Sequence, residues 1–172
     1  MNNYEEEIID PAEVELLPET AAVLSYWDSL LQGRQAPAWE DFDFLALPLN
    51  LIPWCAVVDV DYDPRDYQYR FFGSARVRVQ RTDYTGRRVS TVTPAYLSKK
   101  VAGDYDEIVT TFAPKFFRTT RRSAVNPARK LQYHFLRLPF SDDGTRVDHI
   151  LSFGYFEEGQ IKEMHEFFDH EV

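Results

Sequence analysis

The chain has one cysteine, Cys55, among 172 residues, so it has no internal disulfide. Its longest uncharged run, residues 44–58, is broken by two prolines and an asparagine. That run is shorter than the roughly 18 apolar residues that a membrane span requires. The first residues, including Glu5, Glu6 and Glu7, lack the positive and apolar regions of a secretion signal. We therefore expect a cytoplasmic protein without a membrane span, in which Cys55 is a buried apolar side chain.

The common catalytic motifs are also missing. The sequence contains no P-loop, no Gly-x-Gly-x-x-Gly, no His-Glu-x-x-His, no Cys-x-x-Cys and no Gly-x-Ser-x-Gly. A run of four aspartates on and after a predicted strand lacks the glycine and distal glutamate of a calcium loop, so we interpret it as a solvated strand end: Asp59, Asp61, Asp63 and Asp66. No catalytic residue, metal site or identifiable cofactor is predicted.

Charge is distributed unevenly. The net charge is −9, but residues 1–19 hold seven acids and no base, and residues 157–172 hold six acids and one lysine. The remainder, residues 20–156, has 18 bases and 15 acids, a net charge of +3. An acidic chain of this kind disfavours nucleic acid as a partner. We divide it into an acidic N-terminal segment (1–17), a flanking helix (18–34), a central domain (35–157) and an acidic C-terminal helix (158–172).

The apolar pattern predicts an α+β domain. Pro18 and Gly33 suit the first helical turn and the position after a helix, and a second helix follows Thr93 and ends before Pro114. Residues 55–62, 67–72, 116–125, 131–140 and 147–156 are predicted strands. We expect one antiparallel sheet of five strands with helices on one face and the flanking helices added, its two sides covered by the central helices and by a terminal helix.

Two acidic residues and a glycine mark the last predicted hairpin. Asp143-Gly144 favours a two-residue turn, which would pair Leu138 with His149. Both faces of this hairpin carry aromatic or aliphatic side chains, which is why we expect the sheet to be covered on both sides.

Several segments resemble the PAS fold, and in particular short, stand-alone bacterial PAS-like proteins. The similar pieces are Tyr26-Trp27 with Gly33-Arg34, the strand 56–60, and the segments YRFFGS (69–74), DYTGR (83–87), LPFSDDG (138–144) and VDHIL (147–151). The resemblance covers residues 22–157 and implies a sensory or regulatory module. One departure is Phe135, where the family pattern has a basic residue on the penultimate strand.

The resemblance places a candidate ligand cavity between helices and sheet. We expect it to be lined by Tyr96, Tyr105, Phe112, Phe116 and His134, with Arg70 and Arg121 available to an anion. The same aromatic residues are explained by core packing alone, and a histidine facing the helices by a satisfied core position. The wider basic group also includes Arg76, Arg78 and Arg122, for which pairing with acidic residues, including those of the tails, is the alternative.

Three functional hypotheses follow. The first is a non-catalytic sensory module that binds a small ligand, a signalling protein or both, and acts in trans by a conformational or dimer-equilibrium shift. An anionic small molecule is one candidate for that ligand. The second is a ligand-free homodimerisation or adaptor protein with an interface at Tyr26, Trp27 and Leu30 and at the C-terminal Phe167 and Phe168. For dimerisation through the N-terminal helix, Trp27→Glu is expected to give a folded monomer. The third is a small-molecule enzyme in which His134 acts as general base and an aspartate orients it.

Overall fold

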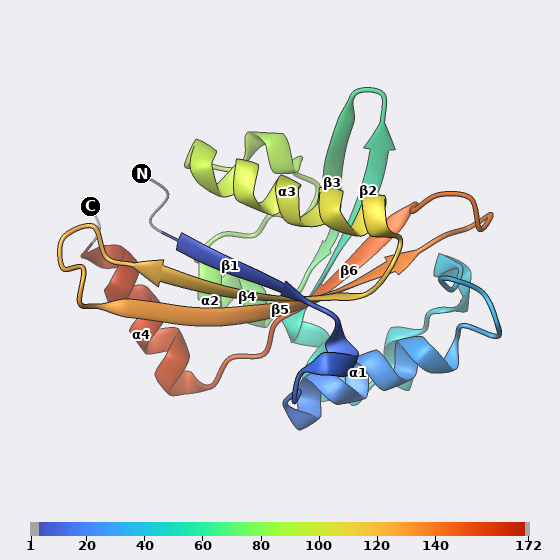
Figure 1. Ribbon diagram of the computed structural model, residues 1–172, viewed down its shortest axis with the longest axis horizontal. Helices are drawn as coiled ribbons and strands as arrows, with labels where there is room; N and C mark the ends of the chain where they lie inside the picture. The colour runs from blue at the N-terminus through green and yellow to red at the C-terminus, as the bar shows by residue number, and fades with distance from the viewer. Residues whose placement is uncertain (1–3, 171–172) are drawn as a thin grey trace.

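The computed structural model describes residues 4–170 and contains a six-stranded antiparallel sheet in the order β1-β4-β5-β6-β2-β3 (Figure 1). The strands are β1 (Tyr4–Ile9), β2 (Cys55–Tyr62), β3 (Arg65–Phe72), β4 (Lys115–Arg122), β5 (Lys130–Phe140) and β6 (His149–Phe153). The helices are α1 (Pro18–Ser29), α2 (Ser74–Gln80), α3 (Ala95–Thr111) and α4 (Glu158–Asp169), joined by short 3-10 helices at Pro11–Glu13, Trp39–Asp41, Phe44–Ala46, Leu49–Trp54 and Val89–Thr91. The predicted α+β class and antiparallel sheet are confirmed.

The prediction of five strands is wrong, because the acidic N-terminal segment forms the sixth. Strand β1 pairs antiparallel with β4, so that Glu5 and Glu7 lie beside Arg122 and Arg118 and form ion pairs at 3.0 and 2.7 Å. Three consecutive glutamates have poor β propensity, and only the neighbouring basic strand makes this segment a favourable edge strand.

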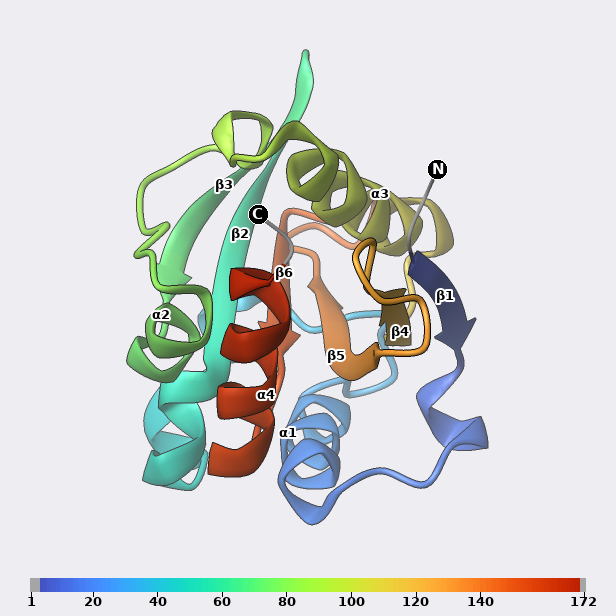
Figure 2. The same ribbon diagram turned by 90° about the vertical axis from the view of Figure 1, so that its left-hand side faces the viewer.

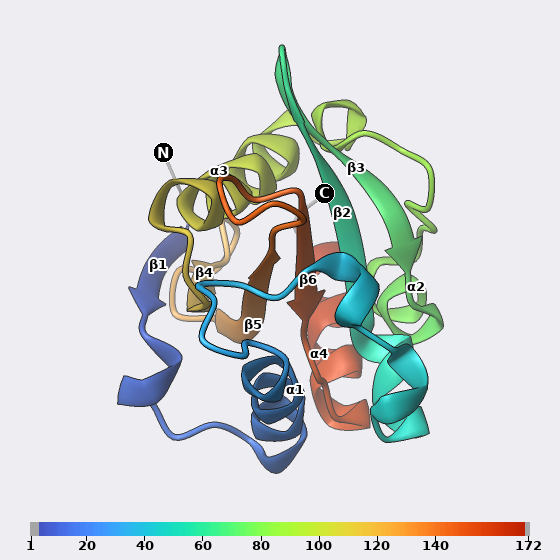
Figure 3. The same cartoon turned by 90° about the vertical axis from the view of Figure 1, so that its right-hand side faces the viewer.

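The two faces of the sheet are both covered as expected, one by central helices and the other by a terminal helix. Helices α2 and α3 pack on one face with the cluster that contains Val58, Tyr105 and Ile150. Helix α1 and the segment after it cover the opposite face (Figure 3). Helix α4 lies on the same side as α2 and α3 and contacts α2, as Figure 2 shows.

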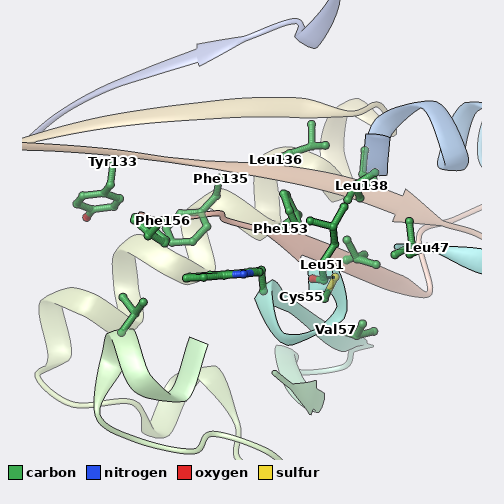
Figure 4. Packing of buried hydrophobic residues seen from close by; sticks show 14 of the residues in the cluster. Leu47, Leu51, Cys55, Val57, Tyr133, Phe135, Leu136, Leu138, Phe153 and Phe156 are labelled. Carbon is green, nitrogen blue, oxygen red and sulfur yellow. Dashed lines mark hydrogen bonds between the residues drawn. The ribbon is translucent and has the colours of Figure 1, made fainter. Parts of the chain in front are cut away.

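The core on the α1 face comes from alternate residues of the central strands. Leu136 and Leu138 of β5 meet Leu51 and Cys55, while Phe135 points to the other side of its strand (Figure 4). Strands buried on both faces need apolar residues on both sides, and β2, β5 and β6 carry such residues on each face. The pKa of Cys55 is raised to about 12 by burial, so this thiol behaves as a small apolar side chain, as predicted.

The β5–β6 hairpin differs from its prediction by two residues. Leu138 pairs with Leu151, and His149 pairs with Phe140, so the predicted Leu138–His149 pair is wrong. The connection is a longer loop, residues 141–148, in which Asp148 Oδ2 accepts from the Asp142 backbone N–H at 2.8 Å. A shift of two residues preserves the side-chain alternation, so residues that were predicted to share a face of the hairpin do share one.

The order β2, β3, helices, β4, β5, β6 is the order that the resemblance implies, and the architecture is consistent with a PAS-like fold. Helix α1 ends at Ser29, earlier than the predicted 34, and the chain turns through Gly33 at φ +81°. The last predicted element, 158–172, includes residues 171–172, which lie outside the described residues. None of the helices among residues 4–170 is long and apolar enough to cross a membrane.

Candidate functional site

A cavity of about 300 Å³ lies between the helices α2, α3 and α4 and the sheet. Its walls are aromatic and aliphatic, but four buried cationic side chains also line it: Arg76, Lys100, Arg121 and Arg137. A fifth cation of the lining, Arg81, is exposed and forms an ion pair with Asp169 at 2.6 Å. The four buried cations come from α2, α3, β4 and β5 respectively. The cavity is therefore assembled from segments far apart in the sequence, and its character depends on how the four cations are neutralised.

Arg76 is buried, and no carboxylate in the described part of the chain pairs with it. It lies in the first turn of α2, directly after Gly73, whose missing side chain allows β3 to end against the backbone of Pro53. The Arg76 guanidinium carbon is 4.4 Å from the ring centroid of Phe135 and 5.4 Å from that of Phe72. Its single hydrogen bond among the described residues is a long one, from Nη1 to the Ser152 carbonyl at 3.5 Å, and Nε has no partner there. Burial lowers the pKa of Arg76 to about 10.

Arg121 is the second buried arginine without a counterion among residues 4–170. It projects from the α3 face of β4 and is 8% exposed. Its guanidinium carbon lies 4.9 Å from the ring centroid of Tyr96 and 5.2 Å from that of Phe168, one ring from α3 and the other from α4. Arg121 Nε also lacks a hydrogen-bond partner among the described residues. The rings stabilise the cation but leave its N–H donors free to bind an acceptor.

The other two cations, Arg137 and Lys100, have carboxylate partners and share one of them, Asp104. Arg137 Nη2 donates to Asp104 Oδ2 at 2.7 Å, and Lys100 Nζ donates to the same oxygen at 3.0 Å. Lys100 also forms an ion pair with Glu6 of β1. Burial by itself would lower the pKa of Lys100, but Asp104 and Glu6 raise it, so the ammonium is retained.

The side chains at the cavity therefore carry more positive than negative charge. Four buried or nearly buried cations are set against Asp104 and Glu6 alone, an excess of two positive charges among the described residues. Buried charges without partners are costly, and three unpartnered Nε–H donors, on Arg76, Arg121 and Arg137, add to that cost. An anion in the cavity would supply both the missing charge and the missing acceptors.

Of the seven predicted ligand residues, three line this cavity: Tyr96, Tyr105 and Arg121. Phe116 and His134 lie on the opposite face of β4 and β5, with ring centroids 5.3 Å apart, beside a separate cavity near α1. The expected orientation of His134 toward the central helices is therefore wrong, because even-numbered residues of β5 face α1. Phe112 ends α3 with a left-handed backbone, and Arg70 is an exposed partner of Asp59 at 2.7 Å, so neither reaches the cavity.

The predicted interface residues are partly internal. Trp27 is 2% exposed, and its Nε1 donates to the Pro139 carbonyl at 2.8 Å. The Tyr26 hydroxyl accepts from the Asp43 backbone N–H at 3.0 Å, and Leu30 is half-buried at the end of α1. Trp27 is thus a core residue that joins α1 to β5, which removes the centre of that interface.

Sequence reasoning missed Lys100 and Arg137 and gave Arg76 only as one of a basic group. The family pattern led to Phe135, whereas Arg137 stands two residues further along and points to the same face of β5. This period of two was the available signal. Other members of the basic group form ion pairs with the acidic tails: Arg78 with Glu158, and Arg122 with Glu5.

The enzyme hypothesis has little geometric support. His134 has no carboxylate partner among residues 4–170, and its Nδ1 is without a hydrogen-bond partner there. The histidine that contacts carboxylates is His149, 2.8 Å from Asp59 and 3.3 Å from Asp142, on the face away from the cavity. No cluster of three or more metal-ligating side chains occurs in the described part of the chain.

Comparison with protein-family models and with curated proteins finds no match. A solved structure described as "Structure of an RNA-binding Light-Oxygen-Voltage Receptor" is similar over 96% of this chain and 43% of its own, with 9% identity and a TM-score of 0.45. The chain thus spans less than half the length of that protein. The class defined by strand order, helix placement and cavity is an α+β protein of PAS-like architecture with a cationic cavity.

Proposed function

We propose that this protein is a non-catalytic PAS-type sensory or regulatory module that binds a small anionic molecule in the cavity between α2, α3, α4 and the sheet. Binding of this molecule changes the conformation or the dimer equilibrium of the protein, and a signalling partner responds to that change. The observation that carries the proposal is the pair Arg76 and Arg121, both buried beside aromatic rings and both without a counterion among the described residues.

Energetics favour a ligand over a purely structural role for these arginines. An unpaired buried guanidinium destabilises a fold, whereas an apolar residue of similar length would pack against Phe72 and Phe135 without that cost. Arginine binds carboxylates and phosphates through two parallel hydrogen bonds, and the unpartnered Nε donors suit such a geometry. Aromatic walls and a volume of about 300 Å³ suit a compact molecule with a flat apolar body and one anionic group.

The alternative is a ligand-free adaptor. Its predicted interface loses Trp27 to the core, and it gives no reason for Arg76 and Arg121 to be buried. A sensory module explains both arginines, so the geometry supports it better.

Thermal unfolding with benzoate and with inorganic phosphate tests the proposal, using sodium chloride at matched ionic strength as the salt control. A ligand at 100 times its Kd stabilises the fold by about 2.7 kcal/mol. That corresponds to a rise in Tm of about 5–10 °C for a chain of this size. We expect such a rise for the wild type with at least one of the two anions.

Two variants of α2 make the test specific. Arg76→Met removes the buried guanidinium, and Arg78→Met removes an exposed one that pairs with Glu158 at 2.8 Å. We expect Arg78→Met to respond to the anion as the wild type does and Arg76→Met to lose the response. Equal responses in both variants, or no response of the wild type to either anion, would contradict the proposal.

A further inference from the structure

The edge strand β1 has one acidic side chain on the cavity side of the sheet. Along β1 the side chains alternate, so Glu5 and Glu7 lie on the α1 side with Arg122 and Arg118. Glu6 lies on the α3 side, where its Oε2 accepts from Thr119 Oγ1 at 2.9 Å and forms the ion pair with Lys100. Thus one strand carries two exposed glutamates and one that is directed toward the buried charges.

Lys100 links this strand to the cavity. Its side chain is 6% exposed, lines the cavity, and places Nζ between Glu6 of β1 and Asp104 of its own helix. An anion in the cavity would therefore approach the same ammonium group that holds Glu6. Strand β1 also contacts Lys100 through the Tyr4 ring, whose centroid is 5.7 Å from Lys100 Nζ.

The two carboxylates that pair with cations of the cavity, Asp104 and Glu6, belong to elements of very different stability. Asp104 belongs to the 17-residue helix α3 and is bonded to Arg137 as well as to Lys100. Glu6 belongs to a six-residue strand that is paired on one edge only, with β4. An edge strand is bonded to a neighbouring strand on one side only, so it opens more readily than a long helix packed on the sheet. Glu6 is accordingly the counterion that the protein is able to exchange.

We propose that binding of an anion in the cavity and docking of β1 oppose each other through Lys100, so that occupancy of the cavity loosens the N-terminal strand. This inference rests on the proposed function and adds to it the segment that responds. When the anion binds, Lys100 gains a third acceptor beside Glu6 and Asp104, and the buried excess of positive charge falls, so the contribution of Glu6 decreases. Linkage is reciprocal, so the factor by which the anion weakens the contribution of Glu6 equals the factor by which Glu6 weakens anion binding. Removing the charge of Glu6 must therefore strengthen anion binding.

The experiment is a benzoate titration by calorimetry on the full chain and on two variants that each remove one charge from β1. Glu6→Gln keeps an acceptor for Thr119 but removes the carboxylate beside Lys100. Glu7→Gln, the matched control, removes the same charge from the neighbouring residue on the opposite face. We expect Glu6→Gln to tighten benzoate binding by about 5-fold or more, the lower end of typical couplings between sites. Glu7→Gln is expected to remain within about twofold of the wild type, because exposed charges are screened.

Hydrogen exchange on the wild type is the second measurement and does not depend on a variant. Saturating benzoate is expected to speed exchange of the amides of residues 4–9 and to leave those of residues 130–140 unchanged or slower. If Glu6→Gln does not fold, hydrogen exchange on the wild type alone decides whether anion binding loosens β1.

The outcomes separate the two proposals. Benzoate binding by the wild type with equal affinities in both variants, weaker binding by Glu6→Gln, or unchanged exchange in residues 4–9 would overturn the coupling and leave the cavity as a binding site. If neither benzoate nor inorganic phosphate, titrated in the same way, binds to the wild type or to either variant, the proposed function is overturned, and the coupling with it.

Discussion

Arg137 and Arg76 lie beside the same phenylalanine ring, but only Arg137 has a carboxylate partner among residues 4–170. Their guanidinium carbons are 5.4 and 4.4 Å from the centroid of Phe135. Both also reach Ser152, Arg137 through the hydroxyl at 3.2 Å and Arg76 through the carbonyl at 3.5 Å. Of these two arginines, only Arg137 is bonded to Asp104. One arginine therefore completes a buried ion pair, while the other remains available to a ligand.

This difference predicts opposite effects on stability. Arg137→Met leaves Asp104 buried with Lys100 as its remaining partner, and breaking one side of a buried ion pair costs about 3–5 kcal/mol. Arg76→Met removes an unpaired buried charge and keeps the contact with the Phe72 and Phe135 rings, so the free energy of unfolding should stay the same or rise. Urea unfolding of ligand-free protein measures both. A large loss of stability in Arg76→Met would mean that its guanidinium is a structural group.

Trp27 is expected to behave as a core residue. Trp27→Ala removes a buried ring and leaves the Pro139 carbonyl without its donor, which together cost about 3–5 kcal/mol. Tyr26→Phe, the neighbouring control, loses one exposed hydrogen bond and should cost about 1 kcal/mol or less. Circular dichroism during urea unfolding distinguishes the two. A folded, fully stable monomer from Trp27→Glu would instead support the interface hypothesis.

Two glycines give a test of the local fold at the start of α2. A Cβ added to Gly73 would lie 2.2 Å from the Pro53 carbonyl oxygen, a backbone atom that cannot move aside without shifting the segment before β2. We expect Gly73→Ala to prevent folding or to cost several kcal/mol, roughly the upper range for single substitutions. Gly103→Ala in α3 meets nothing within 4 Å and should stabilise by about 0.5–1 kcal/mol. Similar midpoints for both variants would show that the close approach at Gly73 is absent.

Acidification should destabilise the protein in part through His134. Burial lowers the pKa of His134 from 6.5, and Arg118 lowers it further. Between the lowered pKa and 6.5 the unfolded chain binds more protons than the folded one, so the stability present above pH 6.5 is lost as the pH falls through this window. His134→Gln lacks this contribution, and its urea midpoint should fall less between pH 7.5 and 5.5 than that of the wild type. Parallel decreases would contradict a depressed pKa.

Local patterns predicted some elements closely. Strand β2 has the predicted bounds, Cys55–Tyr62, because its β-branched residues suit a strand buried on both faces. Strand β1 was not predictable from its own residues, since Glu5, Glu6 and Glu7 become favourable in a strand only beside the basic residues of β4 and Lys100. The β5–β6 register was missed because side-chain hydrogen bonds of the loop, and not the Asp143-Gly144 pair, determine its length.

At the site, the types of residue were more predictable than the directions in which their side chains point. Arg121 lies where the hypothesis requires it, but His134 and Phe116 fall on the other face, because a single position along a strand reverses the direction of a side chain. Which arginines lack a counterion depends on contacts between distant segments, such as Asp104 with Arg137 and Asp59 with Arg70. No local pattern contains that information.

The most direct test of the central claim is NMR observation of the arginine Nε–H groups during a benzoate titration. Arg76 and Arg121 have buried Nε–H donors without partners among the described residues. We expect their two resonances, assigned with the Arg76→Met and Arg121→Met variants, to shift together and to saturate with one affinity, while that of exposed Arg78 does not move. Resonances of Arg76 and Arg121 that stay unchanged while benzoate binds, or that move no more than Arg78, would contradict the account of the cavity as an anion site.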